Sequence, residues 1–394
     1  MRRPVIKSAA IILGSIVASL VWSPRPQIIS LLLLSFLNYF LFVHRDRWKL
    51  QLIVLVPLFI LWSNIHAGYP LGLFIIAAYA LGEFIKGVIH RHSPQNYMNT
   101  AVTLSLVGVL CFLVVAINPN GIQMWKIPFQ TTGMQSLQMF ISEWASPDFH
   151  DLAQQSILWL LFCTFLAMVV DREKIDPADV VILVLFGYMT FVSRRHCGPL
   201  AVVVTPILIR YGASSVDGII EKTRHLSNKS DHNSSLSEGL AKPVRYSRGI
   251  NLFIVASLGF VAIMKFTIVT HPVMVSNFQN RYFPGQAVEI LNGRKFSGNL
   301  LNEYNWGGYI IWSAPGYPVF IDGRTDLYGD EVIGEWRQLM QAEGNWRRSL
   351  SKWGIGIVLL NDDRPLVDKL IQDDWEIVYH QDDRILLING GDHP

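Results

Sequence analysis

The stretch LQLIVLVPLFILWSNI, residues 50–65, decides the fold class because it is a continuous apolar run followed by a second one, YPLGLFIIAAYALGEFIKGVI, at residues 69–89. A helix needs about 20 apolar residues to cross a hydrocarbon core of roughly 30 Å, and fewer when it is packed inside the protein. Apolar residues make up 51% of the chain and charged residues 16%, well to the hydrophobic side of a soluble domain. The sequence therefore predicts a polytopic membrane protein.

About nine segments of this kind are expected to form transmembrane helices. They are Val5–Trp22, Ile28–Val43, Leu50–Ile65, Tyr69–Ile89, Ala101–Ile117, Leu152–Val170, Val180–Val192, Pro199–Ile209 and Ile250–Thr270. The seventh and eighth are short, so a single re-entrant pair is an alternative for them. The first follows MRRPVIK and resembles a secretory signal, but no A-x-A-like cleavage site follows it, so we expect an uncleaved span.

Basic residues predict the orientation, because cytoplasmic loops carry an excess of Lys and Arg. With the N-terminus in the cytoplasm, 17 basic residues lie inside, whereas only Arg25, Lys126, Arg194 and Arg195 lie outside. An odd number of spans then places the C-terminal part outside. We expect a multi-pass protein of the inner (plasma) membrane.

The chain changes character near residue 270. Residues 271–394 contain 11 basic and 17 acidic residues, a net charge of −6, whereas residues 1–270 contain 22 and 13, a net charge of +9. We therefore expect a transmembrane helical domain at 1–270 and a soluble extracytoplasmic domain at 271–394. A polar, serine-rich segment at 211–248 is expected to form a flexible cytoplasmic loop within the first domain.

The soluble part alternates β-type runs with amphipathic ones, which predicts a small α/β domain with a largely parallel sheet. The expected strands are 298–303, 318–322, 355–360, 375–380 and 384–388, and the expected helices are 331–352 and 365–373. Residues 306–312 fit either state, and we favour a helix because parallel neighbours need a crossover. The aromatic residues Tyr304, Trp306, Tyr309, Trp312 and Tyr317 are expected to dock this domain onto the membrane part, with sugar stacking as the alternative.

Several chemistries have no support in the sequence. Only Cys197 of three cysteines lies near the expected outer face, so no disulfide framework or C-x-x-C metal site is available. No basic stripe with interleaved aromatic residues indicates a nucleic-acid partner. The metal requirement stays open, and a divalent metal remains a candidate cofactor.

Basic residues gather on the expected outer face, which requires a partner because they run against the positive-inside rule. Arg25 lies between two prolines, and Arg194, Arg195 and His196 are consecutive. A phosphate of a lipid or substrate would supply the negative charge. The structural alternatives are an ion pair of the cluster with Glu143 or Asp148 and, for Arg25, snorkelling to lipid headgroups.

Four other polar residues lie at the same expected face. Asn64 and His66 either end a helix or line a sugar site. Glu143, in SEWASPDFHD, could act as a general base or metal ligand because a carboxylate near a low-dielectric boundary can have a raised pKa. Asp148, in the same loop, is the second candidate.

Named segments carry a resemblance to a family of bacterial polytopic membrane proteins. They are RPQIISLLL, LWSNIHAGYPLG, INPNG, ISEWASPDF, NEYNWGGYIIW and PVFIDGRTDLYG. That family in turn resembles the GT-C class of glycosyltransferases, which includes protein O-mannosyltransferases and oligosaccharyltransferase catalytic subunits. The resemblance implies a helical membrane domain, a polyprenyl-phosphate-linked sugar as donor, a site at the outer leaflet and an extracytoplasmic domain.

The chain departs from the GT-C pattern at its first external loop. Such enzymes usually carry an acidic residue there, whereas residues 23–27 contain Arg25 and no carboxylate. Either an N-terminal portion that supplies the acid is missing, which we favour, or catalysis is absent. The leading hypothesis is therefore a GT-C-like glycosyltransferase that uses a lipid-linked sugar and need not be complete in this chain, with Arg25, Arg194, Arg195 and His196 at the donor phosphate.

Two other classes remain as alternatives. One is a non-catalytic membrane scaffold that binds envelope polysaccharide or a protein partner. The other is a transporter, which the sequence disfavours because the expected spans hold few ionisable residues, chiefly Glu83, Lys86 and Lys265 near helix ends.

Overall fold

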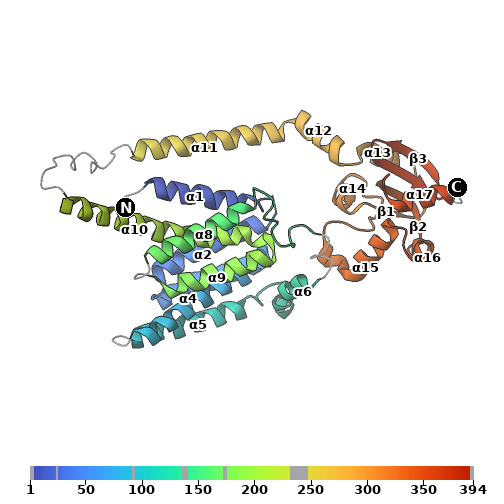
Figure 1. The fold of residues 1–394 in the computed structure, drawn as a ribbon. Helices are drawn as coiled ribbons and strands as arrows, with labels where there is room; N and C mark the ends of the chain where they lie inside the picture. The colour runs from blue at the N-terminus through green and yellow to red at the C-terminus, as the bar shows by residue number, and fades with distance from the viewer. Residues whose placement is uncertain are drawn as a thin grey trace. The chain divides into compact units, whose positions relative to one another are not determined.

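The computed structural model describes residues 4–23, 25–90, 94–134, 141–171, 175–230 and 247–390. Its contacts divide the chain into a helical unit within residues 1–245, apart from a short segment at 134–137, and a second unit within residues 246–394. Figure 1 shows the helices of the first unit and the sheet of the second. We describe each unit by itself.

The helical unit is built from apolar helices joined by short loops. They are α1 (Pro4–Ser19), α2 (Gln27–His44), α3 (Trp48–Ile65), α4 (Pro70–Ile89), α5 (Pro94–Val114), η1 (Gly121–Trp125), α6 (Ile127–Gly133), α8 (Gln155–Val170), α9 (Pro177–Val192), η3 (Arg194–His196) and α10 (Cys197–Ser230). Proline starts several of these helices, at the first-turn position where its missing N–H has no helical partner. The apolar stretches of the sequence end at the loops between these helices. The helix positions therefore match most of the expected segments closely.

Five helices in the described part of the chain are long and apolar enough to cross a membrane: Gln27–His44, Trp48–Ile65, Pro70–Ile89, Pro94–Val114 and Arg194–Ser214. A sixth candidate is a pair, Gly259–Thr270 with Pro272–Tyr282, that bends by 60°. The helices at Ile6–Ser19, Gln155–Val170 and Pro177–Val192 are apolar but shorter. A helical membrane protein is thus indicated, whereas the expected number of nine spans is not confirmed.

The eighth expected segment is longer than predicted. Helix α10 runs from Cys197 to Ser230, so residues 211–230 are helical rather than part of the expected flexible loop. The prediction relied on the polar composition of this stretch. Most polar residues are compatible with a helix, so a helix can continue beyond its apolar part. The rest of the expected loop, residues 231–246, lies outside the described residues.

The interior of the helical unit contains large side chains from several helices, with Trp62, Tyr69 and Phe186 almost completely buried. Helices α4 and α9 approach closely at Gly82, where an added Cβ would lie 2.5 Å from the Cβ of Ala178. Small residues at such a crossing allow two backbones to pack in a membrane, where no hydrophobic effect drives association.

A buried ionic network joins the loop ends of four helices. The carboxylate of Asp176, before α9, accepts hydrogen bonds from Arg45 (2.8 Å) and Lys86 (2.9 Å), and Lys86 also binds Glu83 (2.7 Å). Arg210 and the Tyr211 hydroxyl bind Asp179 on α9. Opposite charges therefore hold the α2–α3 loop and helices α4, α9 and α10 together.

The second unit begins with α11 (Ser247–Thr270) and α12 (Pro272–Tyr282), which lead into a four-stranded sheet with helices on both faces. Its remaining elements are α13 (Gly285–Gly293), β1 (Asn299–Asn302), η4 (Tyr304–Trp306), α14 (Gly307–Ser313), α15 (Thr325–Met340), α16 (Trp346–Lys352), β2 (Ile355–Asn361), α17 (Pro365–Gln372), β3 (Glu376–Gln381) and β4 (Arg384–Ile388). The strand order is β1-β2-β4-β3.

Alternating side chains of the strands build two cores. On one face Leu300, Ile357 and Leu386 pack with residues of α13 and α14. On the other face Leu301, Val358 and residues of α15, α16 and α17 form the second core. This is the period of two that a strand imposes, and it makes the unit a three-layer α/β domain.

The sheet is not largely parallel, which corrects the prediction. Only β1 and β2 are parallel, whereas β4 is antiparallel to both β2 and β3. Strands β3 and β4 are joined by only two residues, Asp382 with φ +55° and Asp383, and a two-residue connection can join antiparallel strands only.

Two other elements differ from expectation. Residues 318–322 do not form a strand, and Val319 makes a single bridge to Leu300. The helix expected over 331–352 is two helices, because Ala342 and Gly344 adopt positive φ values of 50° and 63° and turn the chain between them. The expected helix at 306–312 is confirmed as α14 with the preceding η4.

Candidate functional site

Four predicted site residues lie in loops at the same ends of alternating helices. Arg25 lies between α1 and α2, His66 between α3 and α4, Glu143 before α8, and Arg195 between α9 and α10. Helices that run back and forth place such loops together at one end of a bundle. The contacts below show which of these side chains meet.

Glu143 forms the centre of the cluster through both its side chain and its backbone. One terminal nitrogen of Arg25 lies 2.9 Å and 3.1 Å from the two carboxylate oxygens. The carbonyl oxygen of Glu143 accepts hydrogen bonds from the amide of Arg195 (3.0 Å) and the hydroxyl of Ser193 (3.1 Å). The loop before α8 is thereby fixed against the α9–α10 turn.

Arg195 is held over an aromatic ring rather than by a carboxylate. Its guanidinium carbon lies 4.2 Å from the centroid of the Trp144 ring, a cation–π arrangement. Arg195 is half-buried, and it forms no ion pair within the part of the chain that the structure describes. The indole ring orients this guanidinium, and its N–H groups are placed to bind an anion.

His66 presents a neutral ring to this region. Its Nδ1 accepts a hydrogen bond from the Gly68 amide (3.1 Å) and lies 2.7 Å from the Ser30 hydroxyl, which itself accepts from Trp62 Nε1 (2.7 Å). An amide can only donate, so Nδ1 must be the unprotonated nitrogen and Nε2 carries the hydrogen. Burial, and then the positive charge of Arg195, lower the pKa of His66. His66 is therefore a hydrogen-bond donor through Nε2 at neutral pH.

Two predicted residues have structural partners instead. Asn64 donates from Nδ2 to the carbonyls of Ile60 and Ile117, both at 2.8 Å, and so ties the end of α3 to the end of α5. The ring of His196 lies with Nδ1 3.1 Å from the Met189 carbonyl, at the end of α9. For Asn64 these contacts favour the helix-ending interpretation, whereas the ring of His196 lies against backbone carbonyls and not against Glu143 or Asp148 among the described contacts.

Asp148 lies in the loop before α8, and Arg194 begins η3 directly after α9. The Asp148 carboxylate accepts from the amide of His150 (2.9 Å), a local turn, and its side chain is exposed. The amide of Arg194 donates to the Ala145 carbonyl (3.0 Å), and its charge contributes to lowering the pKa of Asp151, after the hydrogen bonds from Gln154 and Ala153. No contact joins Asp148 to Glu143 among the described residues.

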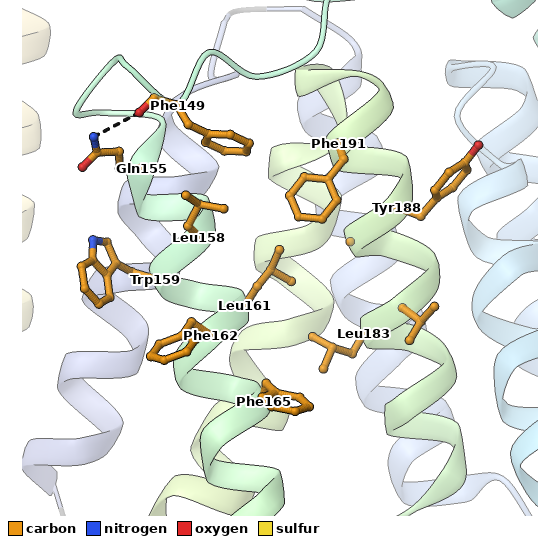
Figure 2. A pocket seen from close by; sticks show the side chains of 12 residues that line it. Phe149, Gln155, Leu158, Trp159, Leu161, Phe162, Phe165, Leu183, Tyr188 and Phe191 are labelled. Carbon is orange, nitrogen blue, oxygen red and sulfur yellow. Dashed lines mark hydrogen bonds between the residues drawn. The ribbon is translucent and has the colours of Figure 1, made fainter.

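A groove of about 800 Å³ between α8 and α9 was not predicted (Figure 2). Its walls are almost entirely apolar, with aromatic rings from Phe149, Trp159, Phe162, Phe165, Tyr188 and Phe191. Phe149 and Phe191 meet edge to face at 6.0 Å, and Phe191 lies three residues before Arg194. The groove therefore ends beside the turn formed by Arg194, Arg195 and His196, which we call the basic turn.

Sequence signals existed for these missed features. Trp159, Phe162 and Phe165 recur at a spacing of three, which places bulky rings along one side of α8. Trp144 directly follows Glu143 in ISEWASPDF. Ser30 gave no signal, because a lone serine in an apolar helix usually bonds its own backbone.

The residues of the described ranges contain no group of three or more His, Cys, Asp or Glu side chains that could hold a metal ion. Glu143 has a cationic partner, Arg25, and lies beside the cationic Arg195, which disfavours a divalent cation at that position. The donor set seen there fits an anion better than a metal.

No protein-family model matches the chain, and no similar curated protein was found. The comparisons therefore do not bear on the resemblance to GT-C enzymes. Function has to be inferred from the geometry of the site.

Proposed function

We propose that this chain is a GT-C-like integral membrane glycosyltransferase of the inner membrane, with a cytoplasmic N-terminus. Its donor is a polyprenyl-phosphate-linked sugar, and its acceptor lies on the extracytoplasmic side. The observation that supports this most is the half-buried guanidinium of Arg195, stacked on Trp144 beside the Arg25–Glu143 pair and free of any described ion pair. Such a group suits one anion of low hydration, and a lipid phosphodiester is one.

The electrostatic setting favours a phosphate at this place. Arg25, Arg194 and Arg195 carry three positive charges, and Glu143 is the only acidic group bonded to any of the three in the described structure. A charge near a low-dielectric boundary interacts more strongly than one in water. In sugar transfer the phosphate is also the leaving group, so the same arginines would stabilise the negative charge that develops on it.

The groove between α8 and α9 fits the hydrocarbon part of the donor. From Gln155 to Phe165 it follows α8 over ten residue-to-residue steps, about 15 Å at the helical rise per residue. This is about half of the roughly 30 Å hydrocarbon core, or one leaflet. A chain lying there would bring its phosphate to the level of Arg194, at the basic turn.

Each reacting group has a named place in this proposal. The bond between the sugar anomeric carbon and the phosphate oxygen breaks, the acceptor hydroxyl forms the new bond, and its proton passes to the Glu143 carboxylate. His66 donates from Nε2 to a sugar hydroxyl or phosphate oxygen. Arg25 orients Glu143, at a cost: its hydrogen bonds occupy both carboxylate oxygens, which the acceptor hydroxyl also needs.

That cost favours a second candidate, the non-catalytic scaffold. The ion pair between Arg25 and Glu143 occupies both carboxylate oxygens, as in a structural contact that only fixes a loop. In that case the site would bind a lipid phosphate without transferring its sugar. Binding and transfer therefore have to be measured separately.

The test uses the full chain in proteoliposomes with radiolabelled polyprenyl-phosphate sugars. Arg195→Ala should weaken donor binding about 10- to 100-fold, because a hydrogen bond to a charged group contributes roughly 1.5–3 kcal/mol and 1.4 kcal/mol is tenfold. Arg47→Ala, an exposed arginine between α2 and α3, is the matched control and should leave binding unchanged. Equal affinity of Arg195→Ala and Arg47→Ala would remove Arg195 from a donor site.

Transfer decides between the two candidates. Release of labelled product by the parent chain that is lost in Glu143→Gln, with donor binding retained, would support the enzyme. Donor binding without transfer to any acceptor tried would favour the scaffold.

A further inference from the structure

The second unit carries an apolar surface that its own core does not use. On α12 it consists of Met274, Val275, Phe278 and Tyr282, with exposed fractions of 51%, 38%, 56% and 52%. On α14 it continues with Ile311 (43% exposed) and Trp312 (73% exposed). We call these six residues the α12–α14 surface.

Helix α12 is amphipathic, and none of the described residues of its unit buries its apolar side. Met274, Phe278 and Tyr282 follow one another at a spacing of four and share a side of the helix. Ser276, Asn277 and Asn280 lie on the other side. No residue of α12 is buried, so this apolar side is left open by the described residues of the unit.

Ring contacts make the surface continuous from α12 to α14. Phe278 lies 4.6 Å from Tyr282 and 6.1 Å from Phe283 between ring centroids. Phe283 stacks on Tyr309 at 4.7 Å, and Tyr309 lies 6.2 Å from Trp312. The two helices therefore present one aromatic surface.

The end of α12 is attached firmly to the sheet domain. The guanidinium of Arg384, on β4 and almost buried, donates to the carbonyls of Asn280 (2.8 Å) and Arg281 (2.6 Å). Trp306 Nε1 donates to the carbonyl of Tyr282 (3.1 Å). These bonds satisfy the last carbonyls of the helix, which otherwise lack partners, and fix its direction on the domain.

Helix α11 identifies what lies next to this surface. Most of its described side chains are apolar and exposed, for example Phe253 (72%), Phe260 (63%) and Phe266 (70%), as expected of a helix surrounded by lipid. Lys265, near the end of the helix, is the charged exception. After His271, α12 turns away by 60° and starts at Pro272. A helix leaving a bilayer at this bend passes through the headgroup layer, where amphipathic helices lie and where Trp and Tyr are enriched.

We propose that the α12–α14 surface is a membrane-interface binding surface, inserted into the headgroup layer of the leaflet from which α11 emerges. Its ligand is the lipid bilayer itself, through apolar and aromatic contact with the region between headgroups and acyl chains. The bonds of Arg384 and Trp306 transmit this attachment to the sheet, so the bilayer sets the orientation of the α/β domain. The proposal does not depend on which chemistry the helical unit performs.

The experiment measures depth with a probe on the full chain in vesicles. In a background with the three cysteines replaced by serine, Trp312→Cys is labelled with an environment-sensitive fluorophore, and the vesicles contain lipids with a nitroxide at the headgroup or high on the acyl chain. Asp368→Cys is the control, since it is exposed on α17, on the opposite face of the sheet from α14. We expect several-fold stronger nitroxide quenching at position 312 than at position 368.

Two results would overturn the proposal. Equal quenching at positions 312 and 368 would place the surface in water. Weak nitroxide quenching at 312, together with protection from aqueous iodide, would show that protein covers it, either the helical unit or a second copy of the chain.

A pair of charge substitutions tests α12 directly. Phe278→Asp puts a carboxylate on the apolar side, whereas Asn277→Asp puts the same charge on the neighbouring polar side. We expect Phe278→Asp, and not Asn277→Asp, to lower quenching at position 312. Equal effects of the two would contradict insertion of the apolar side.

Discussion

Replacing Asp176 should strongly destabilise the helical unit, because one carboxylate binds three partners from different elements. Its Oδ2 accepts from Arg45 and Lys86, and its Oδ1 accepts from the amide of Ala178 (3.1 Å) as the N-cap of α9. The side chains of Asp176 and Lys86 are only 10% and 12% exposed, so water cannot readily replace the carboxylate. Although burial alone would raise it, Arg45 and Lys86 hold the pKa of Asp176 below its usual range.

Two substitutions separate the charge from the cap. Asp176→Asn keeps a capping oxygen but leaves Arg45 and Lys86 with Glu83 as their one described acidic partner, and breaking a buried pair costs about 3 kcal/mol. Asp176→Ala also removes the cap, worth about 1 kcal/mol, so it should cost about 4 kcal/mol. Asp46→Asn, an exposed aspartate in the α2–α3 loop, is the control and should change stability by less than about 0.5 kcal/mol.

The assay is unfolding of the full chain in mixed micelles, followed by far-UV circular dichroism as a denaturing detergent is added. The order of the free energies of unfolding should be parent and Asp46→Asn, then Asp176→Asn, then Asp176→Ala. An Asp176→Asn variant as stable as Asp46→Asn would refute the reasoning, because it would show that the two cations do not need the carboxylate. Equal stability of Asp176→Asn and Asp176→Ala would remove the cap from the account.

The α/β domain yields two further predictions. Gly307→Ala should lower its free energy of unfolding by about 1–3 kcal/mol, because the new Cβ would lie 2.2 Å from the carbonyl oxygen of Ile321. In the same thermal unfolding measurement the control Gly308→Ala, whose Cβ meets nothing within 4 Å, should be neutral or stabilising by up to about 1 kcal/mol. Hydrogen bonds from Arg324 hold the pKa of Asp322 below its usual range, so this carboxylate stabilises the domain above about pH 4 and the contribution is lost as the pH falls through its lower folded pKa. Asp322→Asn should flatten that acid limb in pH-dependent melting, and an unchanged limb would assign it to other groups.

Apolar runs predicted most of the helix positions because burial in lipid needs the same residue type over a whole helix. The starts of α4 and α9 follow from Pro70 and Pro177, which also suit the first helical turn. The number of spans was less predictable, since short apolar helices such as α8 and α9 meet the composition but not the length of a span. The length of a helix in a packed bundle depends on its contacts with neighbouring helices, which the sequence does not show.

The direction of the strands could not be derived from their hydrophobic pattern. Residues 384–388 are buried along almost their whole length, as a central strand of either a parallel or an antiparallel sheet would be. The turn at Asp382 and Asp383 carried the information, but two aspartates are weaker turn signals than Asn-Gly. The buried network around Asp176 was also missed, because its members are 131 and 90 residues apart along the chain.

The candidate site was easier to locate than to interpret. Alternation of helices explains why Arg25 and Glu143, which are 118 residues apart, meet. Sequence reasoning treated the carboxylate as a catalyst and the arginines as phosphate ligands. The structural alternatives were an ion pair of the Arg194–His196 cluster with Glu143 or Asp148 and, for Arg25, snorkelling to lipid headgroups. The structure instead pairs Glu143 with Arg25, a contact that neither alternative named.

The Arg25–Glu143 pair and Arg195 therefore have to be considered as one electrostatic unit. If a donor phosphate binds Arg195 alone, Arg25 stays with Glu143 and both carboxylate oxygens remain occupied. If the phosphate also draws Arg25 away, the Glu143 carboxylate is released when the donor is bound and can accept a hydrogen bond from an acceptor hydroxyl. Arg25→Gln separates these cases: it should leave donor binding nearly intact and preserve or increase transfer in the first, whereas it should weaken donor binding in the second.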